Sequence, residues 1–330
     1  MKRYPFFLTT FLGCVFCMLF VISCLGQQGI KDYKRFYGLL RDQNKDLLVL
    51  RKFEQGGRTQ YLVTDPQELE TRILSAATEA VKPLTWAQTM DIFKETPYIK
   101  AMEAAQMKET PLQDAGIIHG FPKEKGITLT IDLCPSHKPL DRIIFTSLLK
   151  EFQKTEKPVP LALSITGRWM LTHNDDLDWL KNLVKSGDIS ITWVNHSYNH
   201  RVSATAPLKV NFLLEPGTDM NFEVMGTELA MLQHGIVPSV FFRFPGLVSD
   251  PKLISKVLSY GLIPVGSDAW LAKGQTANSG SIVLIHGNGN EPVGVNDFIK
   301  LLQSEQKSVK DKQWMMYDLR ESVEDEFGGK

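Results

Sequence analysis

Two histidines four residues apart are the side chains in this sequence best placed to hold a metal ion. His196 and His200 follow an apolar run at residues 189–194. Residues at positions i and i+4 lie on one face of a helical turn, so we expect both imidazoles to reach the same ion. Two histidines on the surface or at a helix cap could have the same spacing. The residues that follow the other apolar runs favour metal binding over this alternative.

Four more residues of reactive type stand just after other apolar runs: Asp132, Arg243, Asp268 and His286. In βα folds the loops that follow the strands converge on one face, so we expect these side chains to share a pocket with the histidine pair. Each of them also has an ordinary structural explanation. Asp132 could cap a helix and Arg243 could form an ion pair. Asp268 could form a turn, and His286 could be a hydrogen-bonded histidine of the core.

The elements that must position these residues begin after Gly126. Short apolar runs alternate there with amphipathic segments, which predicts an α/β fold with a mainly parallel sheet. The predicted strands are 127–131, 159–165, 189–194, 239–244, 261–265 and 282–285. The predicted helices are 140–153, 175–186, 223–233, 251–259 and 294–307.

The ordered set of sites resembles the five motifs of the polysaccharide deacetylases of the NodB homology domain, carbohydrate esterase family 4. The matching segments are Thr130-Ile131-Asp132, His196-Ser197-Tyr198-Asn199-His200, Arg243-Phe244-Pro245-Gly246, Asp268-Ala269-Trp270 and Leu284-Ile285-His286. The resemblance covers roughly residues 127 to 302. It implies a distorted (β/α) barrel that removes N-acetyl groups from amino sugars with a divalent metal, commonly zinc.

The resemblance also implies a role for each residue. His196 and His200 would hold the ion, and Asp132 would take a proton from water. His286 would donate a proton to the departing sugar amine. In the same scheme Asp268 would keep His286 charged and oriented, and Arg243 would orient the carboxylate base.

One departure from the family leaves the third metal ligand open. The family has two adjacent aspartates, and Leu133 stands in the second position here. Asp132 itself, a water molecule or the thiolate of Cys134 could complete the site. Neighbouring residues of a strand alternate between faces, so Leu133 should point into the barrel wall while Asp132 and Cys134 share one face.

The first 23 residues are typical of an export signal. Lys2 and Arg3 precede an uncharged run to Leu25, and Ser23-Cys24 resembles the cleavage box of bacterial lipoproteins, which predicts a lipidated Cys24. A simple signal peptide and an uncleaved membrane anchor are the alternatives. The protein is therefore expected in the cell envelope, attached to the membrane and facing the periplasm or the exterior.

Residues 24–125 are expected to form a small α+β region ahead of a deacetylase-like domain at 126–330. Within it, residues 46–53 and 59–64 flank Gln55-Gly56-Gly57-Arg58 and predict a β-hairpin. Capping signatures at Asp65-Pro66-Gln67-Glu68 and Thr85-Trp86-Ala87-Gln88 predict two helices, the first running to about Val81.

The charge composition of the chain does not favour nucleic acid as a partner. Thirty-seven basic and 37 acidic residues leave no net field to draw nucleic acid. The leading prediction is an exported, metal-dependent N-deacetylase acting on a cell-wall or extracellular polysaccharide. The alternatives are a hydrolase of non-peptide C–N bonds in small molecules on the same scaffold, and an inactive glycan-binding lipoprotein.

Overall fold

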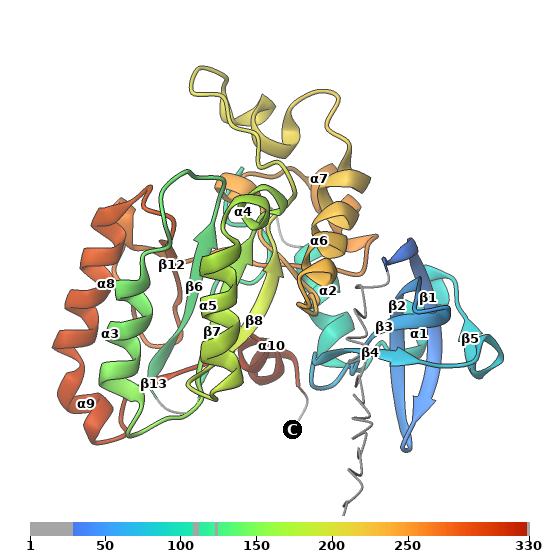
Figure 1. Ribbon diagram of the computed structural model, residues 1–330, viewed down its shortest axis with the longest axis horizontal. Helices are drawn as coiled ribbons and strands as arrows, with labels where there is room; N and C mark the ends of the chain where they lie inside the picture. Colours follow the sequence, from blue (N-terminus) through green and yellow to red (C-terminus); the bar gives the residue numbers. More distant parts are fainter. Residues whose placement is uncertain (1–28, 108–111, 123–124, 329–330) are drawn as a thin grey trace, which may run out of the picture.

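The computed structural model describes residues 29–107, 112–122 and 125–328. These residues form a small antiparallel sheet packed beside a larger, helix-covered parallel sheet (Figure 1). The predicted export signal and Cys24 lie outside the described residues. Among the residues that are described, none of the helices is both long and apolar enough to cross a bilayer.

The small sheet has the strand order β4-β3-β2-β1-β5. Its strands are β1 (Lys31–Asp42), β2 (Lys45–Gln55), β3 (Arg58–Thr64), β4 (Thr71–Ser75) and β5 (Val81–Pro83). The predicted hairpin is confirmed, with β2 and β3 paired up to Gln55 and Arg58. Gly56 and Gly57 both have positive φ, at 64° and 71°, which is the backbone of the tight turn that joins two twisted strands.

The helix predicted over residues 65–81 is wrong. Asp65 does cap a turn, since its side chain accepts hydrogen bonds from the backbone N–H groups of Gln67 and Glu68. The chain then continues as β4, which pairs with β3, and a short 3-10 helix at Thr78–Ala80 leads into β5. Pairing with the exposed edge of β3 satisfies the backbone of this segment, and this tertiary contact overrides its helical pattern.

The larger sheet is parallel, with the order β10-β9-β8-β7-β6-β12-β11, and β13 pairs beside the start of β6. Its strands are β6 (Gly126–Leu133), β7 (Val159–Ile165), β8 (Ile189–Asn195), β9 (Phe241–Phe242), β10 (Ile263–Pro264), β11 (Ala269–Trp270), β12 (Ile282–His286) and β13 (Met315–Met316). Ile117 bridges to Val265 and His119 to Ser281, so the segment before β6 spans the gap between the two ends of the sheet. The predicted distorted (β/α) barrel preceded by an α+β region is confirmed.

Helices cover the outside of this barrel (Figure 1). They are α3 (Arg142–Phe152), α4 (Gly167–Thr172), α5 (Asn174–Lys185), α6 (Thr227–Gln233), α7 (Pro251–Leu258), α8 (Pro292–Ser304), α9 (Gln306–Lys310) and α10 (Leu319–Phe327). A five-residue π-helix at Phe222–Gly226 runs directly into α6. The central strands β6 and β7 are buried along their whole length, as expected for parallel strands covered on both faces.

Two helices connect the small sheet to the barrel. The predicted capping box of α1 (Trp86–Ile92) is present, with Thr85 and Gln88 exchanging hydrogen bonds. Helix α2 (Pro97–Met107) packs against α7, α10 and β10, and its buried residues belong to the same apolar cluster as strand β9. Part of residues 24–125 therefore packs on the barrel, and the domain boundary at 125/126 stays a prediction.

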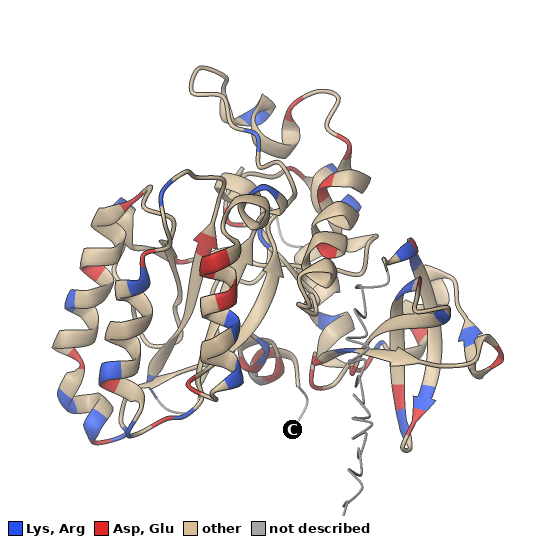
Figure 2. Cartoon of the chain, viewed as in Figure 1, with Lys and Arg blue, Asp and Glu red and all other residues tan. Residues whose placement is uncertain are grey.

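Charged residues of both signs are interspersed over the outer helices and the small sheet in the view of Figure 2. The segment between β8 and α6 projects beyond the end of the barrel, in yellow at the top of Figure 1. It carries two 3-10 turns, at Leu208–Val210 and Phe212–Leu214. This projecting segment forms one wall of the pocket described next.

Candidate metal centre and catalytic pocket

The carboxyl end of β6 brings two functional side chains to one face. Leu133 is fully buried in the apolar core, while Asp132 and Cys134 are both close to the imidazole of His196. This is the alternation that the strand predicts. The pairing of β6 with β12 sets Asp132 in register with His286, so that residues from two strands reach the same end of the sheet.

The two predicted metal ligands lie on a loop that follows β8, and not on the helical turn that their spacing suggested. Ser197 and His200 have positive φ values of 67° and 46°, which interrupt any helix. The loop is held instead by Glu223, whose side chain accepts hydrogen bonds from the backbone N–H groups of Tyr198 and Asn199 at 2.8 Å each. It also accepts one from the Asn199 side-chain amide at 2.7 Å.

Three donor atoms converge in this pocket. The Cys134 sulfur lies 3.5 Å from Nε2 of His196 and 3.3 Å from Nε2 of His200, and all three ligand atoms lie within 4.8 Å of one another. Tetrahedral zinc, with bonds of about 2.3 Å to sulfur and about 2.0–2.1 Å to nitrogen, separates those atoms by roughly 3.5 Å. The donor set therefore fits a zinc-sized ion.

The tautomer of His196 suits this use. Its Nδ1 lies 2.9 Å from the backbone carbonyl oxygen of Arg243, which can only accept, so Nδ1 carries the proton. The lone pair of Nε2 then faces the sulfur of Cys134. A hydrogen bond of this kind behind a metal-binding histidine fixes the ring and raises its basicity.

Asp132 lies beside these donors and is almost fully buried. Its carboxylate is 3.6 Å from His196 Nε2 and 3.7 Å from Arg243 Nη1. Burial alone would raise the pKa of Asp132, but the positive charge of Arg243 leads the effects that outweigh it and hold that pKa below its ordinary value. The structure thus brings together an ionised carboxylate, its arginine partner and the histidine pair.

Cys134 is buried beside three imidazoles. Burial would raise the pKa of its thiol, yet the positive charge that His200 and His286 can carry, with the hydrogen bond to His196, lowers the pKa well below its ordinary value. The default expectation for a lone cysteine, a small inert apolar residue, does not describe this position. Its surroundings favour the thiolate form, and its sulfur lies within reach of the two histidines predicted to bind metal.

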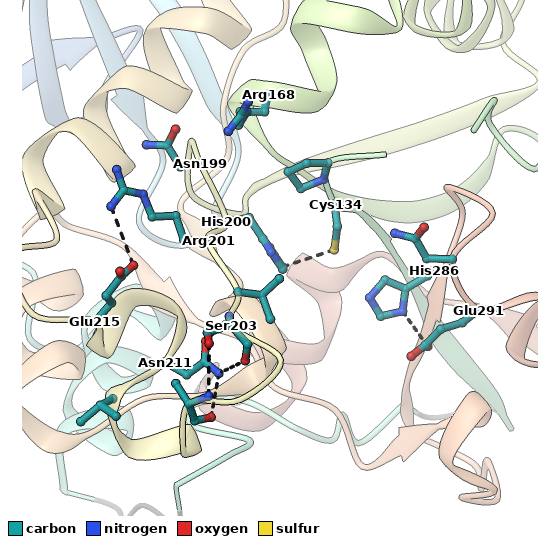
Figure 3. Close-up of a pocket in the computed structure, with 15 residues that line it drawn as sticks. Cys134, Arg168, Asn199, His200, Arg201, Ser203, Asn211, Glu215, His286 and Glu291 are labelled. Carbon is teal, nitrogen blue, oxygen red and sulfur yellow. Dashed lines mark hydrogen bonds and ion pairs between the residues drawn. The ribbon is translucent and has the colours of Figure 1, made fainter. Parts of the chain in front are cut away.

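In Figure 3, His200 and His286 lie on opposite sides of the Cys134 sulfur. The Nδ1 atom of His286 is 2.8 Å from Oε2 of Glu291, which also accepts a hydrogen bond of 2.9 Å from the indole N–H of Trp270. Burial would lower the pKa of His286, but the Cys134 thiolate and the Glu291 carboxylate raise it well above its ordinary value. These surroundings therefore favour the protonated form of the imidazole, which faces the pocket.

The expected pairing of Asp268 with His286 is not the one the structure has. Asp268 lies 2.6 Å from Nδ1 of His119 and accepts a hydrogen bond from the backbone N–H of Ile282. Asp268 therefore contacts the segment before β6 and not His286. The carboxylate beside His286 is that of Glu291, which the sequence reading missed, and its only signal is its place as an acidic residue directly before the first turn of α8.

Some of these residues line one open cleft of about 800 Å³, whereas the buried Asp132 and His196 are not among its lining residues (Figure 3). Cys134, His200, His286 and Glu291 form its floor and one side, and the projecting segment between β8 and α6 forms the opposite wall. The lining residues from that wall are mainly polar: Asn199, Arg201, Ser203, Asn211 and Glu215, with Val202, Ala206 and Val210. Such a wall can offer hydrogen bonds to the hydroxyl groups of a bound sugar.

Two kinds of comparison find proteins similar to this chain. Residues 31–99 match a family model described as the RP012 protein N-terminal domain. Among solved structures, the chain is similar to a family 4 carbohydrate esterase from Bacillus anthracis, with 18% identity and a TM-score of 0.47 over 63% of this chain and 87% of that chain.

Two further structures show the same kind of likeness. A pseudoenzyme of carbohydrate esterase family 4 from Bacillus anthracis matches at 15% identity and a TM-score of 0.43, over 63% of this chain and 68% of that chain. The peptidoglycan deacetylase PdaC from Bacillus subtilis matches at 16% identity and a TM-score of 0.42, over 62% of this chain and 94% of that chain. Because these TM-scores lie below 0.5, we base the function on this chain's own side chains.

Proposed function

We propose that this protein is a metal-dependent N-deacetylase that removes acetyl groups from amino sugars of a polysaccharide. One observation carries the proposal. Asp132, the histidine pair and His286 lie at or just after the ends of three separate strands. His200 and His286 line one open cleft, and the buried His196 and Asp132 lie 3.6 Å from each other, so an ion, a base and an acid for hydrolysis could act at one place.

Each residue of the site has a role in the reaction that suits its charge. When bound at His196 and His200, the ion supplies Lewis-acid polarisation of a carbonyl and acidifies water. Asp132, kept ionised by Arg243, is the base that takes a proton from the attacking water. His286, kept protonated beside Glu291, is the acid that donates a proton to the nitrogen of the leaving amino sugar.

The shape and lining of the cleft support a polysaccharide rather than a small substrate. A cleft of about 800 Å³ that is open to solvent can hold one sugar unit at the ion and let the chain continue on both sides. The polar wall of the projecting segment would then contact sugar hydroxyls. Peptidoglycan, chitin-like chains and exopolysaccharides all carry the N-acetyl group that the site would hydrolyse.

The test is acetate release from these three glycans, measured together with the zinc content of the purified protein. His196→Ala and His200→Ala should each lose the bound ion and acetate release together, because each removes one of two imidazole ligands. His234→Ala is the matched control, since this histidine ends α6 and is not among the residues that line the cleft. Zinc retained in both ligand variants, or zinc-loaded wild type that releases no acetate from any glycan, would refute the proposal.

The location of the protein is part of the same proposal. A small residue before Cys24 at the end of an apolar run supports export and attachment to the membrane through a lipidated Cys24. Labelled fatty acid should appear on the wild-type protein and not on Cys24→Ala. A wild-type protein that never carries the label would exclude this mode of attachment.

A further inference from the structure

We propose that the thiolate of Cys134 is the third protein ligand of the ion, in the place of a carboxylate. The centre would then consist of one sulfur and two imidazole nitrogens. The inference rests on the proposed function for the presence of an ion in this pocket. It goes further by naming the ligand set and the class of metal that this set selects.

The first support is the position of the sulfur. Cys134 follows β6 directly, is 6% exposed, and points to the same side as Asp132 while Leu133 enters the core. Its sulfur lies 3.5 Å and 3.3 Å from the two imidazole nitrogens, close to the roughly 3.5 Å that a tetrahedral zinc ion would impose. Two of the three separations that one zinc ion would impose are therefore already present, and all three donor atoms lie within 4.8 Å of one another.

The second support is the way the surroundings fix these ligands. The side-chain amide of Asn288 donates a hydrogen bond of 2.9 Å to the backbone oxygen of Cys134, which holds this residue at the end of β6. His196 is fixed from behind by the carbonyl of Arg243, and the loop that carries His200 is held by Glu223. These contacts hold the ligand residues in place before an ion binds, as outer-shell contacts of metal centres do.

Asp132 suits a different task. It contacts His196 at 3.6 Å, but among the described residues the donors that cluster within 4.8 Å of one another are those of Cys134, His196 and His200. One oxygen of Asp132 is buried with no hydrogen-bond partner in the described part of the chain, and it faces Arg243 at 3.7 Å. An acceptor left unsatisfied beside the donor set is available to take a proton from water.

A thiolate ligand changes which ions the centre prefers. Carboxylate and carbonyl oxygens favour hard ions such as Mg²⁺ and Ca²⁺, whereas a thiolate favours Zn²⁺ and its softer analogues. A set of one sulfur and two nitrogens with a position left for water is that of a catalytic zinc site. We therefore expect the protein to bind Zn²⁺, Co²⁺ and Cd²⁺ and to leave Mg²⁺ and Ca²⁺ unbound.

Cobalt substitution tests the ligand directly, because a thiolate bound to Co²⁺ gives a charge-transfer band in the near ultraviolet that nitrogen and oxygen ligands do not give. The full chain is used, with Cys14, Cys17 and Cys24 changed to Ser so that Cys134 is its one sulfur ligand of this type. This parent should show the band at one equivalent of Co²⁺. Cys134→Ser should lose the band and weaken the Co²⁺ dissociation constant by more than about 100-fold, beyond the loss expected from an outer-shell partner.

Two further variants separate the alternatives. Asp132→Asn should keep both the ion and the band, because this side chain is the base and not a ligand. Cys134→Asp should bind Co²⁺ without the band, through a carboxylate in the same place. Co²⁺ bound by the parent with no charge-transfer band, or a band that survives Cys134→Ser, would overturn the ligand assignment alone. Failure of the parent to bind Co²⁺ or Zn²⁺ would overturn the proposed function with it.

Discussion

The carboxylate that contacts His286 is one of the groups that raise the pKa of this proposed acid, after the Cys134 sulfur. Glu291 accepts from Nδ1 of His286 at 2.8 Å, whereas Asp268 bonds to His119. A carboxylate beside an imidazole stabilises the charged form and therefore raises its pKa. The proposed acid is protonated below that pKa, so activity should fall as the pH rises through it.

We therefore expect Glu291→Gln to move the alkaline limb of the rate profile to lower pH, because removing the negative charge lowers the pKa of His286. The plateau should fall as well, because the ring of His286 is less well oriented without the carboxylate. Acetate release measured from pH 5 to pH 10 gives the limb. Asp268→Asn is the matched control and should leave the limb in place, and a limb that moves in the control but not in Glu291→Gln would reverse the assignment.

Which site residues the sequence could predict depends on where their partners lie. His196, Asp132 and Arg243 each lie at or just after the carboxyl end of a strand, so the convergence of strand ends brings them together. Asp268 precedes the short edge strand β11 and turns toward His119, which belongs to a segment with no periodic pattern. Strand ends predict a common pocket, but they do not predict which acid contacts which base.

At the scale of elements, the buried strands were the easiest to recognise. Strands β6 and β7 are buried along their whole length and β8 along most of it, so each appears as a short segment rich in apolar and β-branched residues. Strand β4 and the loop at 196–200 were misread as helical. Their sequences have helical spacing, and the contacts that decide otherwise, with β3 and with Glu223, come from other parts of the chain.

The π-helix at Phe222–Gly226 accounts for the stability of the histidine loop. It presents Glu223, a side chain that is 5% exposed, to the backbone of Tyr198 and Asn199. Hydrogen bonds to a charged acceptor contribute about 1.5–3 kcal/mol each. They offset the strain of the positive φ values at Ser197 and His200, and so they hold both imidazoles in place for the ion.

Glu223→Ala should therefore weaken Zn²⁺ binding by about 10- to 100-fold, the range of outer-shell partners, although the residue touches no ligand atom. The dissociation constant is measured by competition with a chelating dye, with circular dichroism to confirm that the fold is kept. Glu215→Gln is the control, because Glu215 is an acid that lines the same cleft and pairs only loosely with Arg201, at 3.8 Å. A folded Glu223→Ala protein with unchanged zinc affinity would contradict this role.

At the scale of the whole molecule, the small sheet is attached to the barrel through a buried ion pair. The guanidinium of Arg51 on β2 makes two hydrogen bonds of 2.7 Å to the carboxylate of Glu228 on α6. The two side chains are 0% and 1% exposed, and Tyr33 donates a further hydrogen bond to the same carboxylate. Because α6 continues the π-helix that carries Glu223, one continuous helical segment contacts both the small sheet and the histidine loop.

The contact between the small sheet and the barrel could not be predicted from the sequence. Arg51 stands in a strand between Leu50 and Lys52, where a basic residue ordinarily points to solvent, and nothing near it indicates a distant carboxylate. Its burial follows from the position of the sheet against α6 and the turn after α7, where Arg51 also donates to the backbone oxygen of Tyr260 at 2.7 Å. The ion pair joins residues 177 positions apart, far beyond any local pattern.

The ion pair should make the two parts unfold together. Glu228→Gln leaves the Arg51 charge buried without its counter-charge, and Arg51→Met does the same to Glu228, so each should lower the free energy of unfolding by about 3–5 kcal/mol. In the double variant no unpaired charge remains, and the amide introduced at position 228 can still accept a hydrogen bond from Tyr33, so its loss should be clearly smaller than the sum of the two single losses. Urea unfolding followed by circular dichroism and by tryptophan fluorescence measures both the energies and the number of transitions. Additive losses would show that the pair contributes nothing as a pair, and two separate transitions in the wild type would show that the sheet and the barrel are not one cooperative unit.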